Sequence, residues 1–317
     1  MALFLDEQNV TELLSMEVAI AAVEEALRQH GLGTAVNNPR TRVRLPTGQL
    51  HMMGGALPTL GVFGYKAYTA VKGTVRFHVM LYSTATGEAL AMLQADRLGQ
   101  MRTGAASGVA TKYMARADAH SIGIIGTGWQ ARSQLAAICA VRTIRAIKAF
   151  GRDAGRRQEF CVEMSRELGV GVEPATTAEE AVRGMDIVVT ATVARDPVFD
   201  GQWLEPGAHV NAIGSNALIR REIDETTARR SALIVVDSRE QARLECGDLL
   251  GPLERGTIHW GQIRELGEVV AGFIPGRREA SDITLFESHG LAIWDLASAL
   301  AVYNAAKSKG MGREVTL

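Results

Sequence analysis

Apolar residues recur at helical spacing near the start of the chain and at strand spacing after it. Between Met16 and Leu27 they stand four, three and four residues apart, and Gly31 follows, which predicts one amphipathic helix with a glycine stop. Short apolar and β-branched runs, broken by glycines, then extend over 41–93 and predict an antiparallel or mixed sheet. Residues 103–116 are rich in alanine and other small residues, so we expect a closely packed helix there.

The pattern changes at Ser121, where short apolar runs begin to alternate with helical stretches. The expected strands are 122–125, 144–150, 186–192, 209–213 and 233–236, and the helices among them end near 141, 168 and 184. This alternation predicts a parallel, doubly wound sheet. A last apolar helix, 291–306, is expected to leave that sheet. The chain is therefore predicted to consist of one part made of 1–116 plus 289–317 and an inserted part of 117–288.

Composition limits the kind of partner. The length of 317 residues fits about two domains, and 34 Lys and Arg balance 35 Asp and Glu, so no electrostatic footprint for nucleic acid is present. No apolar run reaches the about 20 residues of a membrane span, and the N-terminus lacks a secretory pattern, so we expect a cytoplasmic protein without a membrane partner. Cys139, Cys161 and Cys246 have no metal-ligand spacing, so we expect a reduced chain without a metal site. The expected partner is a small molecule.

Residues 126–131, GTGWQA, match G-x-G-x-x-A between an expected strand and an expected helix. Gly126 permits the tight turn, Gly128 lets a pyrophosphate approach the backbone, and Ala131 lets the helix pack near the strand. The segment predicts a Rossmann-type dinucleotide site, with a purely structural turn as the alternative. The predicted fold class is thus α/β, a Rossmann-type doubly wound parallel sheet inserted in an α+β domain. The candidate cofactor contacts are Gly126, Thr127, Gly128, Trp129, Gln130, Ala131 and Thr192.

The end of the second expected strand indicates which cofactor binds. NAD-specific folds place an acidic residue there for the ribose 2′-hydroxyl, but this chain has Gly151 followed by Arg152. An arginine can bind a 2′-phosphate through charge-assisted hydrogen bonds, so we predict NADPH over NADH, with Arg152 as a contact. Two alternatives stay open: Arg152 is a solvated loop residue, or Asp153 serves NAD from one position later.

Three basic residues of the first part are candidates for substrate binding: Arg40, Lys66 and Arg102. Converging cations would bind a carboxylate, and a lysine desolvated in a cleft can shift its pKa enough to donate a proton. A lone Arg or Lys is more often a solvated surface residue. His78 lies on an expected apolar strand and is more often a core histidine than a catalyst.

Several segments carry a resemblance when taken together. They are GYKAYT around Lys66, TGEAL at 86–90, RTGAAS at 102–107, the GTGWQA loop, DPV at 196–198, PGAHVNAIG at 206–214, REID at 221–224 and GLAIWDL at 290–296. Their order resembles the ornithine cyclodeaminase/μ-crystallin family, which also contains archaeal-type alanine dehydrogenases and cyclic ketimine reductases. The resemblance covers nearly the whole chain.

The resemblance implies a homodimer in which 1–116 and the C-terminal helix form a catalytic and dimerisation domain. Carried over by position, Arg40, Lys66 and Arg102 would hold the substrate carboxylate, with Lys66 closest to the reacting carbon and nitrogen. Arg42 and Arg44 lie in the same stretch as Arg40, so the register there could differ by two residues. The segment around Asp295 would lie near the nicotinamide, with no chemical role assigned to that residue.

Two departures from the family pattern bear on the reaction. Ornithine cyclodeaminases carry an aspartate where this chain has Asn216, and asparagine cannot act as a general base. Upstream, His51 stands where cyclodeaminases place a glutamate for the distal amine. Neither change removes hydride transfer, which needs a positioned nicotinamide, a bound carboxylate and a proton source.

The sequence therefore favours an NAD(P)H-dependent reductase of 2-imino acids. The expected substrates are cyclic ketimines such as Δ1-pyrroline-2-carboxylate or Δ1-piperideine-2-carboxylate, and the products L-proline or L-pipecolate. Arg40 and Arg102 would clamp the carboxylate, Lys66 would protonate the imine nitrogen, and Asn216 would orient the substrate. The alternatives are an open-chain amino acid dehydrogenase, an ornithine cyclodeaminase, and a non-catalytic NADPH-binding protein like μ-crystallin.

Overall fold

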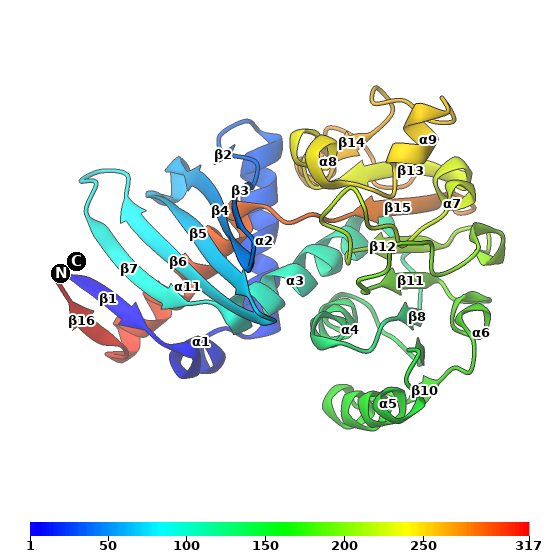
Figure 1. Cartoon of the computed structure of the whole chain (residues 1–317), viewed down its shortest axis with the longest axis horizontal. Coiled ribbons are helices and arrows are strands. Elements are labelled where there is room, and N and C mark those ends of the chain that lie inside the picture. The colour runs from blue at the N-terminus through cyan, green and yellow to red at the C-terminus, as the bar shows by residue number, and fades with distance from the viewer. Residues whose placement is uncertain (317) are drawn as a thin grey trace. The chain divides into compact units, whose positions relative to one another are not determined.

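The computed structural model describes residues 1–316, which form two compact units (Figure 1). The first unit contains Met1–Ala105 and the C-terminal stretch that begins at Gly290, and the second contains Ala106–His289. Over the described residues, each unit has its own eight-stranded sheet. One division falls inside the helix α3 (Asp96–Met114), before the boundary expected after residue 116, and the other falls before Gly290, one residue later than expected.

The sheet of the first unit is mainly antiparallel, in the order β16-β1-β7-β6-β5-β4-β2, with β3 also paired to β4. Its strands are β1 (Ala2–Leu5), β2 (Val36–Asn37), β3 (Thr41–Leu45), β4 (Gly48–Leu57), β5 (Val62–Val71), β6 (Thr74–Ser83), β7 (Ala89–Gln94) and β16 (Arg313–Val315). The three longest, β4, β5 and β6, form a continuous meander in which Lys66 faces Met53 on one side and Val79 on the other. The mixed sheet predicted for 41–93 is thus confirmed.

Helices α1 (Glu7–Leu13), α2 (Met16–Gly31) and α11 (Ala292–Lys309) complete this unit. The predicted amphipathic helix is α2, which begins after Ser15, whose hydroxyl accepts from the backbone of Val18. Helix α11 packs on α2 and on β4, β5 and β6. Its first eight residues, Ala292–Ala299, are all buried, so this half of the helix is enclosed on every side.

The second unit contains the predicted parallel, doubly wound sheet, in the order β10-β9-β8-β11-β12-β15-β13-β14. Its strands are β8 (Ser121–Ile125), β9 (Ala146–Phe150), β10 (Val172–Pro174), β11 (Ile187–Thr190), β12 (His209–Ala212), β13 (Ser231–Val236), β14 (Arg264–Glu265) and β15 (Ile283–Glu287). Its helices are α4 (Trp129–Val141), α5 (Ala154–Leu168), α6 (Ala178–Val182), α7 (Glu225–Arg230), α8 (Arg239–Glu245), α9 (Leu250–Glu254) and α10 (Leu266–Val270). The sequence did not predict β15, which lies between β12 and β13.

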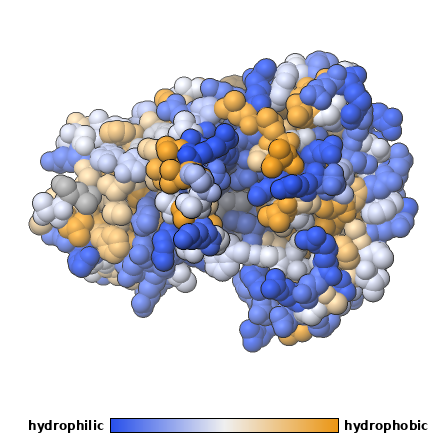
Figure 2. All heavy atoms as spheres, in the orientation of Figure 1, coloured by the Kyte–Doolittle hydropathy of each residue, from blue (hydrophilic) through white to orange (hydrophobic). Residues whose placement is uncertain are grey.

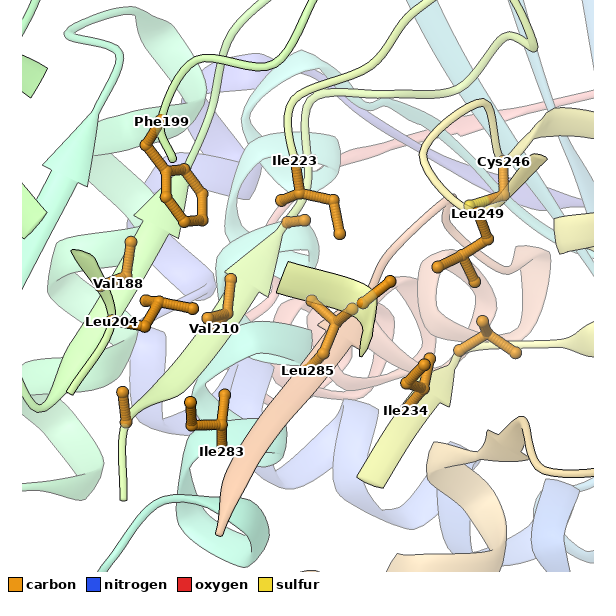
Figure 3. Close-up of a cluster of buried hydrophobic side chains, with 14 of the residues drawn as sticks. Val188, Phe199, Leu204, Val210, Ile223, Ile234, Cys246, Leu249, Ile283 and Leu285 are labelled. Carbon is orange, nitrogen blue, oxygen red and sulfur yellow. The ribbon is translucent and has the colours of Figure 1, made fainter. Parts of the chain in front are cut away.

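Both faces of this sheet are buried. On β11, Ile187 and Val189 join one hydrophobic cluster while Val188 joins the other, because successive side chains of a strand point to opposite faces. Figure 3 shows the cluster that contains Val188. Val188 on β11, Val210 on β12 and Leu285 on β15 come from three adjacent strands. Burial on both faces explains why β8, β11 and β13 are almost continuously apolar.

Helix α3 begins at Asp96, seven residues before the expected start at 103. Its small residues do allow close packing, because a Cβ added at Gly108 would lie 3.1 Å from Ala137 on α4. Within the described residues, no helix has the length and apolar character needed to cross a bilayer. On the face in Figure 2, hydrophilic side chains predominate and hydrophobic ones form scattered groups between them.

Candidate functional site

Lys66, Arg102 and Asp295 form a buried ion triad in the first unit. Strand β5 supplies Lys66, α3 supplies Arg102 and α11 supplies Asp295. The Lys66 Nζ donates to Asp295 Oδ1 at 2.9 Å, and the Arg102 Nε donates to the same oxygen at 3.0 Å. Lys66 is 1% exposed and Asp295 is 0% exposed. Buried charges of this kind persist only when they are paired, so the carboxylate of Asp295 is what allows two cations to lie there.

The surroundings set the proton affinity of Lys66. Burial and the nearby charge of Arg102 lower its pKa, the Asp295 carboxylate raises it, and the net result is a pKa of about 8. The ammonium is therefore mostly protonated at neutral pH but can release its proton within about one pH unit above it. An acid–base group of this kind is useful in catalysis because its pKa is close to the working pH.

Two glycines make room for the triad. A Cβ at Gly99 would lie 3.3 Å from the Lys66 Nζ. Gly290 has φ of +87°, a conformation that other residues rarely adopt, and a Cβ there would lie 2.8 Å from the Arg102 Nη1. A side chain at Gly290 would therefore be strained and crowded, and one at Gly99 would press against Lys66.

Aromatic rings line the sheet beside Lys66. The Nζ lies 4.8 Å from the ring centroid of Phe77 and 5.8 Å from that of Tyr68. His51 stacks on Tyr68 with a centroid distance of 4.1 Å and an interplanar angle of 7°. Burial and the charges of Arg42 and Arg40 lower the pKa of His51 to about 4, so its imidazole is neutral at pH 7.

The three predicted basic residues lie together in this unit. Arg40 is 7% exposed, its Nε lies 3.4 Å from the Met53 Sδ, and its charge also lowers the pKa of Lys66. Arg42 and Arg44 were the alternatives to Arg40 for carboxylate binding. Arg42 is half-buried and Arg44 is exposed. His78 lies half-buried on β6.

The GTGWQA loop joins β8 to α4 in the second unit. Gly126 has φ of +109°, and a Cβ there would lie 2.4 Å from the Ala191 carbonyl oxygen. Gly128 is the N-cap of α4, and a Cβ there would meet nothing within 4 Å. Ala131 is fully buried in the hydrophobic cluster that also contains Ile122 and Ile124 of β8. The open backbone at the start of α4 fits a pyrophosphate, since the first N–H groups of a helix have no partner within it.

The other candidate cofactor contacts surround this loop. Thr127 lies against Gly151, because a Cβ added at Gly151 would be 2.6 Å from the Thr127 Oγ1. Trp129 is 57% exposed at the first position of α4, and Gln130 follows it. Thr192 lies just beyond β11, and its Oγ1 accepts from the Ala194 backbone at 3.1 Å.

The residues after β9 bear on the choice of cofactor. Arg152 is exposed, whereas the carboxylate of Asp153 caps α5 by accepting from the Arg156 backbone at 3.0 Å. Arg157 donates to the Gly151 carbonyl oxygen at 2.7 Å. The carboxylate of Asp153 is thus engaged in capping, and Arg152, Arg156 and Arg157 lie close to it in the chain.

Glu222 was not singled out from the sequence, yet its carboxylate ties together the loops after β11 and β12. It accepts from the Thr190 hydroxyl at 2.9 Å, from the Thr192 backbone at 2.5 Å and from the Gly214 backbone at 2.7 Å. Burial raises its pKa to about 7. Asn216 lies in the loop after β12 and accepts from the Arg220 Nη1 at 3.5 Å. Glu222 therefore shapes the loops that carry two of the predicted site residues, Thr192 and Asn216.

Comparisons with known proteins agree over nearly the whole chain. The model of the ornithine cyclodeaminase/mu-crystallin family matches residues 2–310. An alanine dehydrogenase from Archaeoglobus fulgidus is 37% identical over 99% of this chain and 98% of its own, and a Δ(1)-pyrroline-2-carboxylate reductase from Bacillus cereus is 34% identical over 96% of each.

Two solved structures have the same fold along their entire length. The Δ(1)-pyrroline-2-carboxylate reductase of Thermococcus litoralis, in complex with NADH and L-proline, has a TM-score of 0.94 at 37% identity and covers 99% of this chain and 100% of its own. An archaeal alanine dehydrogenase dimer with bound NAD has a TM-score of 0.93 at 36% identity and covers 100% of this chain and 99% of its own.

The exposed position of Gly128 yields a test of the dinucleotide site. Gly128→Ala adds a methyl group where nothing else lies within 4 Å, so the unfolding temperature should stay nearly unchanged. The same methyl group should obstruct the pyrophosphate and weaken NADPH binding by at least about tenfold, which is about 1.4 kcal/mol. Gly171→Ala, which also has open space, is the control, and isothermal titration measures both. Undiminished binding in Gly128→Ala would place the cofactor elsewhere.

Proposed function

The chain belongs to the ornithine cyclodeaminase/mu-crystallin family, and we propose that it is a nicotinamide-dependent reductase of 2-imino acids. The substrates are cyclic ketimines such as Δ1-pyrroline-2-carboxylate or Δ1-piperideine-2-carboxylate, and the products are L-proline or L-pipecolate. The observation that carries the proposal is the buried Lys66 ammonium, held with Arg102 on one oxygen of Asp295. The similar reductases from Bacillus cereus and Thermococcus litoralis support the choice of substrate.

The residues of the first unit divide the chemistry between them. Arg102 holds Asp295 through Nε, which leaves its Nη groups to bind the substrate carboxylate together with Arg40. Lys66 donates a proton from Nζ to the imine nitrogen, and the pKa of about 8 makes that donation possible near neutral pH. Asp295 keeps Lys66 charged until the proton is needed. The bound nicotinamide supplies the hydride that reduces the C=N carbon.

Ornithine cyclisation is less well supported because the chain lacks the proton acceptor for it. Asn216 has no basic group, and His51, which stands at the position of the cyclodeaminase glutamate, has no negative charge to pair with a distal amine. An alanine dehydrogenase is the strongest rival, because the comparisons of sequence and of structure both find an archaeal alanine dehydrogenase among the similar proteins. It would use the same carboxylate site and the same lysine on an open-chain imine.

NADPH is the proposed cofactor in preference to NADH. The support is local: Arg152 is exposed beside the ribose position, Arg156 and Arg157 follow in the first turn of α5, and Asp153 is occupied as the helix cap. Three guanidinium groups at one helix start favour a 2′-phosphate over a 2′-hydroxyl.

The proposed assembly is a homodimer built on the first unit. Side chains alternate along a strand, so the sheet face opposite Lys66 carries Met52 on β4 and Phe63 on β5. Both are exposed, as are Val43 and Leu45 on β3. An exposed apolar patch on one sheet face favours burial against a second copy. The dimer of the similar archaeal alanine dehydrogenase is consistent with this proposal.

A substrate panel tests the reaction directly. NADPH oxidation should have its highest kcat/KM with five- or six-membered cyclic 2-imino acids. A higher value with pyruvate and ammonia, or with pyruvate and methylamine, would instead identify an open-chain dehydrogenase or reductive aminase. Proline and ammonia formed from ornithine would identify a cyclodeaminase, and NADPH binding without any turnover would identify a binding protein.

Removing the proton donor should abolish turnover without removing the cofactor. Lys66→Met keeps a chain of similar length, and the loss of general acid catalysis should lower kcat for imine reduction by about 10²–10⁴-fold. NADPH affinity should be unchanged. Lys309→Met, at the exposed end of α11, is the control and should behave as the unmodified chain does. Full activity in Lys66→Met would exclude the assigned role.

The pH dependence should report the ionisation of Lys66. Imine reduction requires the protonated lysine, so its kcat/KM should fall as pH rises through about 8, whereas oxidation of the amino acid should rise there. Asp295→Asn removes the carboxylate that raises the Lys66 pKa, and the midpoint should move to lower pH. Asp196→Asn, whose side chain is 86% exposed, should leave the profile unchanged. Identical midpoints in all three proteins would contradict this account.

Cofactor preference should depend on Arg152. In Arg152→Ala the KM for NADPH should rise by about tenfold while the KM for NADH changes little, because only NADPH carries the 2′-phosphate. Arg166→Ala, in the last turn of α5, is the matched control. A lower KM for NADH than for NADPH in the unmodified chain would overturn the proposed preference.

A further inference from the structure

A mixed set of metal-ligating side chains lies in the second unit and shares no residue with the ion triad. Cys246 ends α8, Glu287 is the last residue of β15, and His289 follows two residues later. One potential ligand atom from each lies within 4.8 Å of the other two. The three residues are 3%, 1% and 4% exposed, so this is an enclosed cluster rather than a group of surface acids.

We propose that Cys246, Glu287 and His289 bind a zinc-like divalent transition-metal ion. One thiolate sulfur, one carboxylate oxygen and one imidazole nitrogen are ligand types that Zn²⁺ accepts in tetrahedral sites. Mg²⁺ and Ca²⁺ prefer oxygen ligands alone, so this set selects against them. Three protein ligands leave a fourth position for water or a small anion.

The carboxylate of Glu287 gives independent support. Its Oε1 is buried and has no hydrogen-bond partner among the described residues, and its Oε2 lies 4.0 Å from the Cys246 Sγ. Buried polar atoms nearly always have a partner, and an orphaned one calls for an explanation such as an ion. A cation bound to the Glu287 carboxylate would give this oxygen a partner.

Asp237 orients the histidine. One carboxylate oxygen accepts from the His289 backbone at 2.6 Å, and the other lies 3.4 Å from the ring Nδ1. Metal-ligating histidines typically have a carboxylate or carbonyl at the ring nitrogen that does not bind the metal. The ligand cluster thus already has the supporting contact that such sites require.

The surroundings are acidic, which favours a cation. Asp248, Glu222 and Asp237 act electrostatically on Glu287 and add negative charge around the cluster. The Cys246 thiol must lose its proton to bind the ion as a thiolate. The bound ion would then connect the C-terminal end of α8 to the C-terminal end of β15.

The experiment uses the untagged full chain after chelator treatment, titrated with Co²⁺ and then Zn²⁺. We expect one equivalent of Co²⁺ to bind with a thiolate-to-cobalt absorption band that Zn²⁺ abolishes, and Zn²⁺ to raise the unfolding temperature. Cys246→Ser should lose the band, Glu287→Gln should weaken binding by at least about tenfold, and Asp237→Asn should weaken it by about 10–100-fold. Cys139→Ser, a half-buried cysteine outside the cluster, should bind as the unmodified chain does.

Two results would overturn the proposal. One is the absence of stoichiometric binding to the unmodified chain. The other is binding that survives in both Cys246→Ser and Glu287→Gln, which would indicate an adventitious site elsewhere. If Cys246→Ser does not fold, Glu287→Gln alone decides. Imine reduction is not part of the readout, so failure of the proposed enzymatic function would leave this test unaffected.

Discussion

One shared carboxylate oxygen holds the first unit's chemistry together. Asp295 Oδ1 accepts from both Lys66 and Arg102 in a place that water scarcely reaches. Two buried cations without this oxygen would repel each other and lose hydration without compensation. With it, Arg102 stays charged and oriented while the lysine retains a pKa near the physiological range. The interaction therefore positions the two cations and sets the acidity of one of them.

The fold supplies each member of this interaction from a different element. The meander β4-β5-β6 places Lys66 on the side of the sheet that α11 covers, and α11 returns from the far end of the chain with Asp295. Gly99 and Gly290 keep the space around the cations free of side chains. A sheet face with one buried lysine and a helix with one buried aspartate are each costly alone. Their pairing makes both tolerable, and the proposed reaction exploits it.

Local patterns predicted much of the fold. The spacing from Met16 to Leu27 predicted α2, and the alternation of strands and helices after Ser121 predicted the parallel sheet, because each of these elements is marked by residues that are close together in the chain. Strand β15 was missed because its five residues have no neighbouring βα repeat to mark them. The start of α3 at Asp96 was missed because the prediction rested on the small-residue stretch from residue 103, and polar residues such as Asp96 and Arg97 precede that stretch.

The candidate site was less accessible to prediction. Lys66 and Arg102 were singled out, but Asp295 received no role because it lies 229 and 193 residues from them. Glu222 accepts from Thr190 and Thr192, which are 32 and 30 residues away in the chain, and only the folded sheet brings them together. The cluster of Cys246, Glu287 and His289 escaped a search for metal-ligand spacing for the same reason: 41 residues separate the cysteine from the glutamate.

The central claim is that Asp295 holds Lys66 as a buried ammonium that can give up its proton near neutral pH. Because the chain has only six lysines, a side-chain NMR titration can be assigned by comparison with Lys66→Met. The account predicts one lysine that titrates at about 8, with a lower midpoint in Asp295→Asn. A Lys66 resonance that titrates above pH 10, or one whose midpoint does not change in Asp295→Asn, would contradict it.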